Sequence, residues 1–178
     1  MDSSDYRKRL IFISNSSHYT EVLSRVQSVK HTLWIGTADI KDLYVNVGRE
    51  KKPFLALIAQ LIRRGVEVRL IHAKEPGPNF REDFDKHPIL FGGLKRLLCP
   101  RVHFKLLVFD GKTVYIGSAN LTGAGIGMKN DNKRNFEAGI LTDEPELVAQ
   151  AINQFDNVWR GKHCKTCQRK DFCPNPIV

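Results

Sequence analysis

The chain has 178 residues, of which 42% are hydrophobic and 26% are charged, so we expect one soluble domain with a sizeable core. Its longest apolar runs, such as residues 54–59, are far shorter than the roughly 18 residues that cross a bilayer. Acidic residues precede the first basic cluster, which argues against a signal peptide and favours a cytoplasmic location. The 28 Lys and Arg against 19 Asp and Glu give a net charge of +9, which favours a polyanionic partner, either nucleic acid or an anionic membrane surface.

The first half of the chain alternates between short β-prone runs and helical patterns. Runs of branched apolar residues predict strands, and apolar residues spaced three or four apart predict helices. Ser16 and Ser17 are candidate caps of the first helical segment, and Pro53 and Gly65 are typical of the start and end of the next helix. In chain order we expect a strand at 10–14, a helical segment over 16–29, a strand at 33–36, a helix over 53–65 and a strand over 66–72.

The second half begins with an irregular segment, residues 74–88, whose prolines predict a long loop with one helical turn near 81–84. Farther on, Asp110-Gly111 is a strong hairpin signal. The other expected elements are strands over 102–109 and 113–117, a glycine-rich stretch over 117–127, a strand over 136–141 and an amphipathic helix over 144–159. Helices interspersed with strands predict an α/β sandwich. The composition changes only near residue 160, so we divide the chain into a domain at 1–160 and a basic, cysteine-rich tail at 161–178.

The segment 101–120 carries the residues that are hardest to explain by packing. His103 and Lys105 are two residues apart on an apolar strand, so both side chains leave the same face, where two basic groups favour an anion between them. Downstream, Gly117, Ser118 and Asn120 follow a strand. Backbone N–H groups, a hydroxyl and an amide at such a point can cradle a phosphate.

Together these residues closely resemble the HKD signature of the phospholipase D superfamily. The spacing runs from His103 and Lys105 through Asp110 to Gly117-Ser118 and Asn120, and every signature position matches. The resemblance implies the family's α/β/α sandwich with a mixed central sheet. The small size and the single motif are similar to the bacterial endonuclease (Nuc-like) branch.

The resemblance also implies a reaction at phosphodiesters. In this family a histidine attacks phosphorus to give a phosphohistidine, and a second histidine protonates the leaving oxygen and then activates water. His103 would supply one of these groups. Because this sequence holds a single motif, the resemblance implies a homodimer with the active site at the two-fold interface. No metal is required for catalysis, since lysine and asparagine side chains bind the phosphoryl oxygens.

The other signature residues take roles from the same resemblance. Lys105 and Asn120 would bind the non-bridging oxygens, and Ser118 would add a hydroxyl. Glu137, in the Asn-Phe-Glu sequence on the next strand, would accept a hydrogen bond from His103 and orient its ring. Asp110 is counted with the catalytic candidates, although its place at the hairpin fits a structural role better.

Four cysteines lie outside the signature. Cys164, Cys167 and Cys173 have the spacing C-x2-C-x5-C in the tail, and Cys99 lies four residues before His103. Two thiolates in C-x2-C can bind one metal, so we expect a structural zinc site of these four cysteines, with His163 as a substitute for Cys99. An iron–sulfur cluster fits the spacing less well. Free thiols are the other alternative.

Charge favours nucleic acid, DNA or RNA, as the substrate. Basic residues flank the expected site at Lys129, Lys133 and Arg134, where they could bind the phosphates of a polymer. Five more cations lie in the tail region, namely Arg160, Lys162, Lys165, Arg169 and Lys170.

Two alternatives remain open from the sequence. The first is a phospholipase or cardiolipin-type lipid phosphodiesterase, which would need an exposed apolar element near the site. Residues 89–91 are the best candidate for that element, and residues 44–47 are a weaker one. The second alternative is a non-catalytic nucleic-acid-binding module, against which the intact His103 argues.

Overall fold

The fold is seen in a computed structural model that describes residues 10–41 and 43–174. The N-terminal residues 1–9, used above to argue against a signal peptide, lie outside the described residues. A seven-stranded sheet has the spatial order β1-β9-β8-β7-β2-β5-β6. Its strands are β1 (Leu10–Ser14), β2 (Thr32–Thr37), β5 (Glu67–His72), β6 (Leu94–Leu98), β7 (Lys105–Phe109), β8 (Thr113–Gly117) and β9 (Ala138–Thr142).

The sheet is mixed. Strands β2, β5 and β6 run parallel to one another, whereas β7, β8, β9 and β1 follow on the other side of β2 with each strand antiparallel to the one before it. A separate two-stranded hairpin is formed by β3 (Tyr44–Val47) and β4 (Glu50–Pro53). The prediction of an α/β sandwich with a mixed central sheet is confirmed.

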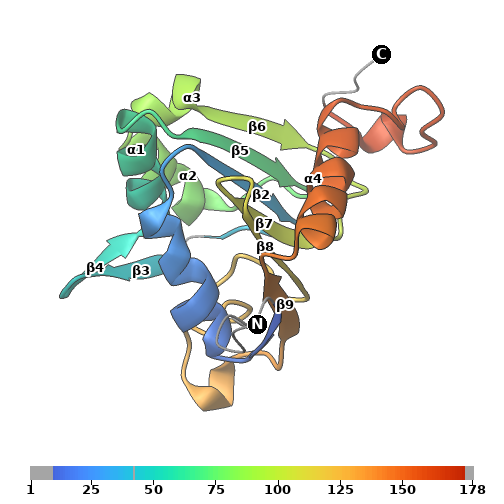
Figure 1. Ribbon diagram of the computed structural model, residues 1–178. Coiled ribbons are helices and arrows are strands. Elements are labelled where there is room, and N and C mark those ends of the chain that lie inside the picture. The colour runs from blue at the N-terminus through green and yellow to red at the C-terminus, as the bar shows by residue number, and fades with distance from the viewer. Residues whose placement is uncertain (1–9, 42, 175–178) are drawn as a thin grey trace, which may run out of the picture.

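Helices cover both faces of the sheet (Figure 1). On one face lies α4 (Pro145–Trp159), which packs on β7 and β8. The other face is covered by α1 (Phe54–Arg63) and by a one-turn π-helix, η1 (His18–Val22), that continues into a 3₁₀ segment, η2 (Leu23–Ser28). Two short helices, α2 (Pro78–Asp85) and α3 (Ile89–Gly93), add to this layer.

Strand β7 is the centre of the core, because all five of its residues are buried. Leu106 and Val108 face α4, whereas Leu107 and Phe109 face the layer that contains α1. A strand that is apolar on both faces is typical of the middle layer of a sandwich. This position fixes where Lys105, the first residue of β7, can lie.

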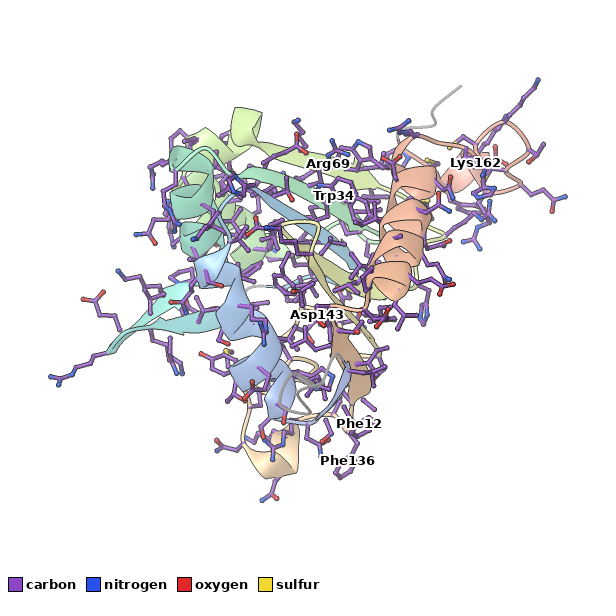
Figure 2. The ribbon with its side chains drawn as sticks, viewed as in Figure 1. Phe12, Trp34, Arg69, Phe136, Asp143 and Lys162 are labelled. Carbon is purple, nitrogen blue, oxygen red and sulfur yellow. The ribbon has the colours of Figure 1, made fainter. Side chains whose placement is uncertain are left out.

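The α4 layer is held by stacked aromatic rings and one arginine. Trp34 of β2 stacks on Phe155 of α4 with ring centroids 5.1 Å apart. The Arg69 guanidinium lies 4.7 Å from the Trp34 centroid and 5.3 Å from the Trp159 centroid (Figure 2 labels Trp34 and Arg69). Both tryptophans therefore serve packing, because cation–π contacts and stacking fix α4 on the sheet.

The hairpin between β7 and β8 is anchored by its aspartate. Asp110 and Gly111 both have positive φ, 51° and 64°, as the turn requires. The Asp110 carboxylate accepts hydrogen bonds from the backbone N–H groups of Lys30, His31 and Thr32, at 2.7 to 3.2 Å. Asp110 thus ties the hairpin to the start of β2.

The sequence missed strands β3, β4 and β6 and the short helix α3. The irregular segment 74–88 contains the two-turn helix α2 rather than a single turn. Strand β6 escaped because Lys95 and Arg96 interrupt its apolar pattern. The helical segment expected over 16–29 divides into η1 and η2.

No helix in residues 10–41 or 43–174 has the length and apolar character that a membrane span needs.

Replacing Asp110 by asparagine should destabilise the protein. Burial alone would raise the pKa of Asp110, but the backbone N–H groups of Thr32, His31 and Lys30 outweigh it and hold the pKa below its usual value. A lowered pKa contributes stability that is present above the unfolded-state pKa, about 3.9, and is lost as pH falls through the folded-state value. We expect D110N to lose about 2 kcal/mol at neutral pH.

Urea unfolding of the wild type and of D110N between pH 7 and pH 2 measures this loss of stability. The difference between wild type and D110N should shrink in acid, and a difference that stayed constant from pH 7 to pH 2 would contradict the role assigned to the carboxylate.

Candidate functional site

Strand ends bring the signature residues to one edge of the sheet. Lys105 at the start of β7 pairs with Gly117 at the end of β8, and Gly117 pairs with Gly139 near the start of β9. On the other side of β7, β2 ends at Thr37. Because these strands alternate in direction, polar residues that are distant in sequence meet at this edge.

His103 and Lys105 lie close together, but the strand expected over 102–109 begins only at Lys105, so His103 is not on the strand. His103 precedes β7 and is exposed, whereas Lys105 is 6% exposed. The Lys105 Nζ donates to the His103 carbonyl oxygen at 2.7 Å and lies 3.4 Å from each ring nitrogen. An exposed imidazole beside a buried ammonium is suited to receive a phosphate from the solvent side.

Asn120 is oriented by two residues at the end of β2. Its Oδ1 accepts a hydrogen bond from the Asp39 backbone N–H at 3.1 Å and from the Thr37 hydroxyl at 3.3 Å. Within the described part of the chain, its amide nitrogen has no hydrogen-bond acceptor. The amide is therefore held by its oxygen, and its N–H groups remain available to an anion. Thr37 and Asp39 were not predicted from the sequence.

Ser118 and Glu137 form a second contact at the same edge. The Ser118 hydroxyl donates to Glu137 Oε2, and the Asn135 amide donates to Oε1 at 3.1 Å. Among the described residues, no hydrogen bond joins His103 to Glu137, so the predicted orienting bond is not formed within this subunit. The Glu137 carboxylate is held by Ser118 and Asn135 instead.

Asp110 lies apart from these residues. It follows the last residue of β7, whereas Lys105 is the first, and five residues of strand span roughly 17 Å. Its carboxylate is occupied by the three N–H groups at the start of β2. Its inclusion among the catalytic candidates is therefore corrected in favour of the structural role.

A buried histidine beneath the site was missed by the sequence. His18 is fully buried, donates a hydrogen bond from Nδ1 to the Asn15 carbonyl oxygen at 2.9 Å, and packs edge-on against Tyr115. Burial lowers the pKa of His18, an effect that Asn15 and the charge of Glu137 partly oppose. Because a carbonyl accepts only, Nδ1 carries the proton in the neutral ring.

Glycine is required at position 117 by the same layer. A Cβ there would meet the Tyr115 hydroxyl, lie 2.6 Å from Cζ of that ring and lie 2.9 Å from the Ala138 carbonyl oxygen. The glycine of the signature thus allows the close approach of β8 and β9 below the site.

The four cysteines also come together. Cys99, which precedes β7, lines one small cavity with Cys164, Cys167 and Cys173 of the tail. As they lie, no three His, Cys, Asp or Glu side chains among residues 10–41 and 43–174 are close enough to hold a metal ion. The structure therefore brings the predicted cysteines to one place without forming a coordination sphere.

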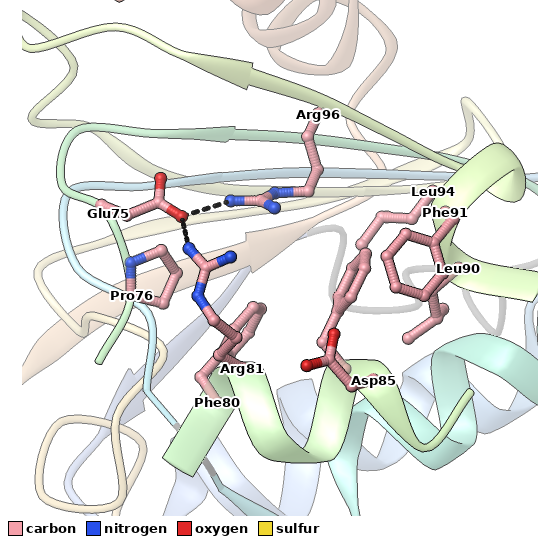
Figure 3. A pocket seen from close by; sticks show the side chains of 10 residues that line it. Glu75, Pro76, Phe80, Arg81, Asp85, Leu90, Phe91, Leu94 and Arg96 are labelled. Carbon is pink, nitrogen blue, oxygen red and sulfur yellow. Dashed lines mark hydrogen bonds and ion pairs between the residues drawn. The ribbon is translucent and has the colours of Figure 1, made fainter. Parts of the chain in front are cut away.

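A pocket of about 360 Å³ lies elsewhere, between α2, α3 and β6 (Figure 3). None of the signature residues lines it. The Glu75 carboxylate lies between the guanidinium groups of Arg81 and Arg96, at 2.6 and 3.5 Å, so these charges offset one another. Leu90 in its wall is fully buried, and Phe91 is 66% exposed. Of the lipid-binding element considered at 89–91, Leu90 thus belongs to the core, whereas Phe91 is exposed.

Two comparisons use the sequence alone. Residues 22–159 match the family described as "Cardiolipin synthase, PLD-like domain". A mitochondrial cardiolipin hydrolase from Chlamydomonas reinhardtii is 27% identical over 104 residues, which are 58% of this chain. The match spans 44% of the length of that relative.

Solved structures share the fold at low identity. NucT from Helicobacter pylori superposes with a TM-score of 0.62 at 17% identity, over 84% of this chain and 94% of that one. Nuc, a phospholipase D family member from Salmonella typhimurium, gives 0.63 at 18% identity, over 84% and 93%. TrmBL2, an archaeal chromatin protein, gives 0.60 at 14% identity, over 89% of this chain and 55% of its own.

Replacing Lys105 by methionine should stabilise the fold and weaken anion binding. Burial lowers the pKa of Lys105, and the charge of Glu137 offsets this effect only in part. The charged ammonium therefore costs the folded state stability at pH values below that pKa. Removing it should raise the free energy of unfolding at pH 7 by about 1 kcal/mol, or roughly 2–4 °C in Tm. Thermal unfolding and calorimetric titration with inorganic phosphate measure both effects.

Lys112→Met is the matched control, since Lys112 is exposed at the opposite end of the same hairpin. This variant should change neither the free energy of unfolding nor the affinity for phosphate. A K105M protein that is less stable and binds phosphate as well as wild type would refute the assignment of Lys105.

Proposed function

This chain belongs to the family of phospholipase D-like domains, and from that premise we propose that it is a metal-independent, homodimeric nuclease that cleaves nucleic acid through a phosphohistidine. The observation that carries the proposal is the pair at the sheet edge, an exposed His103 ring with the buried Lys105 ammonium 3.4 Å from its nitrogens. A polymer phosphate bound by that ammonium would place phosphorus beside a nucleophilic ring nitrogen.

The reaction balances in two displacements. A ring nitrogen of His103 attacks phosphorus, and the bond from phosphorus to the leaving oxygen breaks as the partner's histidine donates a proton to that oxygen. Water then loses a proton to this second histidine, attacks phosphorus and releases His103. Lys105 and the N–H groups of Asn120 would stabilise the negative charge that develops on the non-bridging oxygens. Ser118 would hold Glu137 ready to orient a protonated ring.

The second histidine must come from another chain in this proposal, and a surface suited to that contact borders the site. The sheet face over β1 and β9 extends beyond α4, which packs on β7 and β8. In the register, Ile116 lies beside Ile140, and Ile140 lies beside Phe12. Phe12 is 70% exposed, and Phe136, next to Glu137, is 94% exposed (Figure 2). We assign this strip, Phe12, Ile116, Phe136 and Ile140, to a second copy of the chain.

Exposed cations near the site favour nucleic acid as the substrate. Lys129 and Lys133 lie exposed between the site loop and β9. In the tail region Arg160, Lys162, Lys165, Arg169 and Lys170 are all exposed. Basic side chains on both sides of a phosphodiester site can follow a chain of phosphates. The structural neighbour TrmBL2 is described as binding DNA, which is consistent with a polyanion on this fold.

A lipid phosphodiesterase is the second candidate. The exposed rings of Phe12 and Phe136 could enter a membrane interface instead of contacting a partner. The similarity to a cardiolipin hydrolase also favours a lipid phosphodiesterase.

Replacing His103 by alanine should abolish cleavage, by at least about 1,000-fold, because the attacking nitrogen is removed. A panel of single- and double-stranded DNA and RNA and of anionic liposomes, with and without fresh chelator at short times, measures this. We expect wild-type activity on nucleic acid that resists the chelator and weakens steeply with salt. Activity on liposomes alone would establish the lipid candidate, and undiminished cleavage by H103A would remove His103 from the mechanism.

Replacing Phe12 by glutamate should separate the dimer and abolish cleavage together. Phe91→Glu is the matched control, since Phe91 is equally exposed but lies on α3, beside the other edge of the sheet. Light scattering and cleavage assays measure both proteins. In a further experiment, equal amounts of wild type and H103A are mixed and allowed to exchange subunits. If both histidines of a dimer are needed, the mixture should keep about a quarter of the activity of the same total amount of wild type, and if each subunit works alone it should keep about half. An active F12E monomer would contradict the shared site.

A further inference from the structure

The tail after α4 is compact without a core of its own. Backbone turns shape residues 161–174, with hydrogen bonds such as Cys164 N–H to the Gly161 carbonyl at 2.8 Å and Cys173 N–H to the Lys170 carbonyl at 2.9 Å. None of these residues is buried, and Phe172 is 67% exposed. A short segment that buries no apolar side chain needs another constraint to keep one conformation.

Among the described residues, four thiols lie where they could supply such a constraint together. Cys99, Cys164, Cys167 and Cys173 line one cavity of about 30 Å³, all four are half-buried, and none is in a disulfide. A cavity of this size has room for a bound ion.

We propose that Cys99, Cys164, Cys167 and Cys173 are the four ligands of a structural metal centre, with zinc as the favoured ion, that fastens the tail to the segment in front of His103. Four cysteine thiolates complete the tetrahedral sphere of a structural zinc site. Zn–S bonds of about 2.3 Å would draw the sulfurs, which do not yet converge in the described residues, into the cavity that they line. The metal takes no chemical part in the proposed reaction, so the presence of the centre can be tested without an activity assay.

The surroundings suit bound thiolates. The Arg169 backbone N–H donates to Cys167 Sγ at 3.4 Å, an outer contact that steadies a ligand sulfur. Arg101, Arg169 and Lys170 line the same cavity. Their charge would offset the net negative charge of four thiolates around one divalent ion.

The cavity also decides between the candidate ligands. His163 lines a neighbouring pocket with Cys99, Cys164 and Cys167, but it does not line the cavity that all four cysteines share. Cys99 therefore keeps its place in the ligand set, and His163 is left as a neighbour.

The centre would act on the site through a short piece of backbone. The Cys99 N–H donates to the His72 carbonyl at the end of β5, and the Val102 N–H donates to the Cys99 carbonyl at 3.0 Å. His103 is the next residue. Fixing Cys99 would fix the turn that sets the position of the exposed His103 ring.

The test is the metal content of the full chain, purified without chelator under anaerobic conditions. We expect about one zinc per wild-type chain. The Cys99→Ser and Cys164→Ser variants should lose most of it, and His163→Ala should retain it. Cobalt exchanged into the wild type should show the strong absorption bands of a tetrahedral thiolate site. Chelation should lower the unfolding temperature of the wild type and leave that of C164S unchanged.

If the wild type instead contains iron with stoichiometric sulfide, and the same cysteine variants lose both, the four-cysteine centre stands with iron as its metal instead of zinc. Metal-free wild-type protein would overturn the proposal, as would full metal content in C99S. The serine variants could lose zinc because they misfold, so Cys173→His serves as a second variant that still offers a zinc ligand, an imidazole, at this position. It should retain zinc with a weaker cobalt–thiolate absorption, and an unchanged spectrum would exclude Cys173.

Discussion

The position of the Lys105 ammonium is the constraint on which the candidate site depends. Strand β7 is buried on both faces, so its first residue enters the core edge with its charge only 6% exposed. An ammonium in that place favours an anion beside it, because its own described contacts are to the carbonyl and ring of His103. The same burial that weakens the fold therefore prepares the anion site.

Both ends of β7 are fixed by polar contacts of different kinds. At the far end Asp110 binds three backbone N–H groups and has no role at the site. At the near end Asn120 is held by Asp39 and Thr37, so that its amide faces outward. Lys105 begins β7 and Asn120 follows β8, and these two strands pair, so the contacts of Asn120 keep both residues in a fixed relation. This matters because preorganised donors stabilise charge without reorganising.

The parts of the site that could be predicted from sequence are those set by local geometry. Two-residue spacing put His103 and Lys105 on one side of an extended chain, and the Asp110-Gly111 pair marked the turn. The residues that were missed act across the fold. His18 reaches the site from η1, and Thr37 and Asp39 meet Asn120 only because β2 and β8 end at the same edge. No local pattern carries that information.

The same contrast explains the elements that were missed. Strand β6 carries two adjacent cations, Lys95 and Arg96, which is compatible with its place at the edge of the sheet. Helix α2 did carry a signal, since Pro78 begins it and Phe80 and Phe84 are four residues apart, but the neighbouring prolines favoured a loop. Prolines mark where a helix starts as readily as where one is absent.

Two features on opposite sides of His103 now have related roles in the proposals. The strip of Phe12, Ile116, Phe136 and Ile140 would bring a second histidine toward it, and the four cysteines would hold the turn from which it projects. A histidine exposed at the start of a strand has few contacts of its own to restrain it. Its productive position must then come from its neighbours. A reaction that needs two such rings at one phosphorus tolerates only small errors in their positions, well below about an ångström. If His103 is the proposed nucleophile, its exposure is thus more consistent with an interface completed by a second chain than with an idle surface residue.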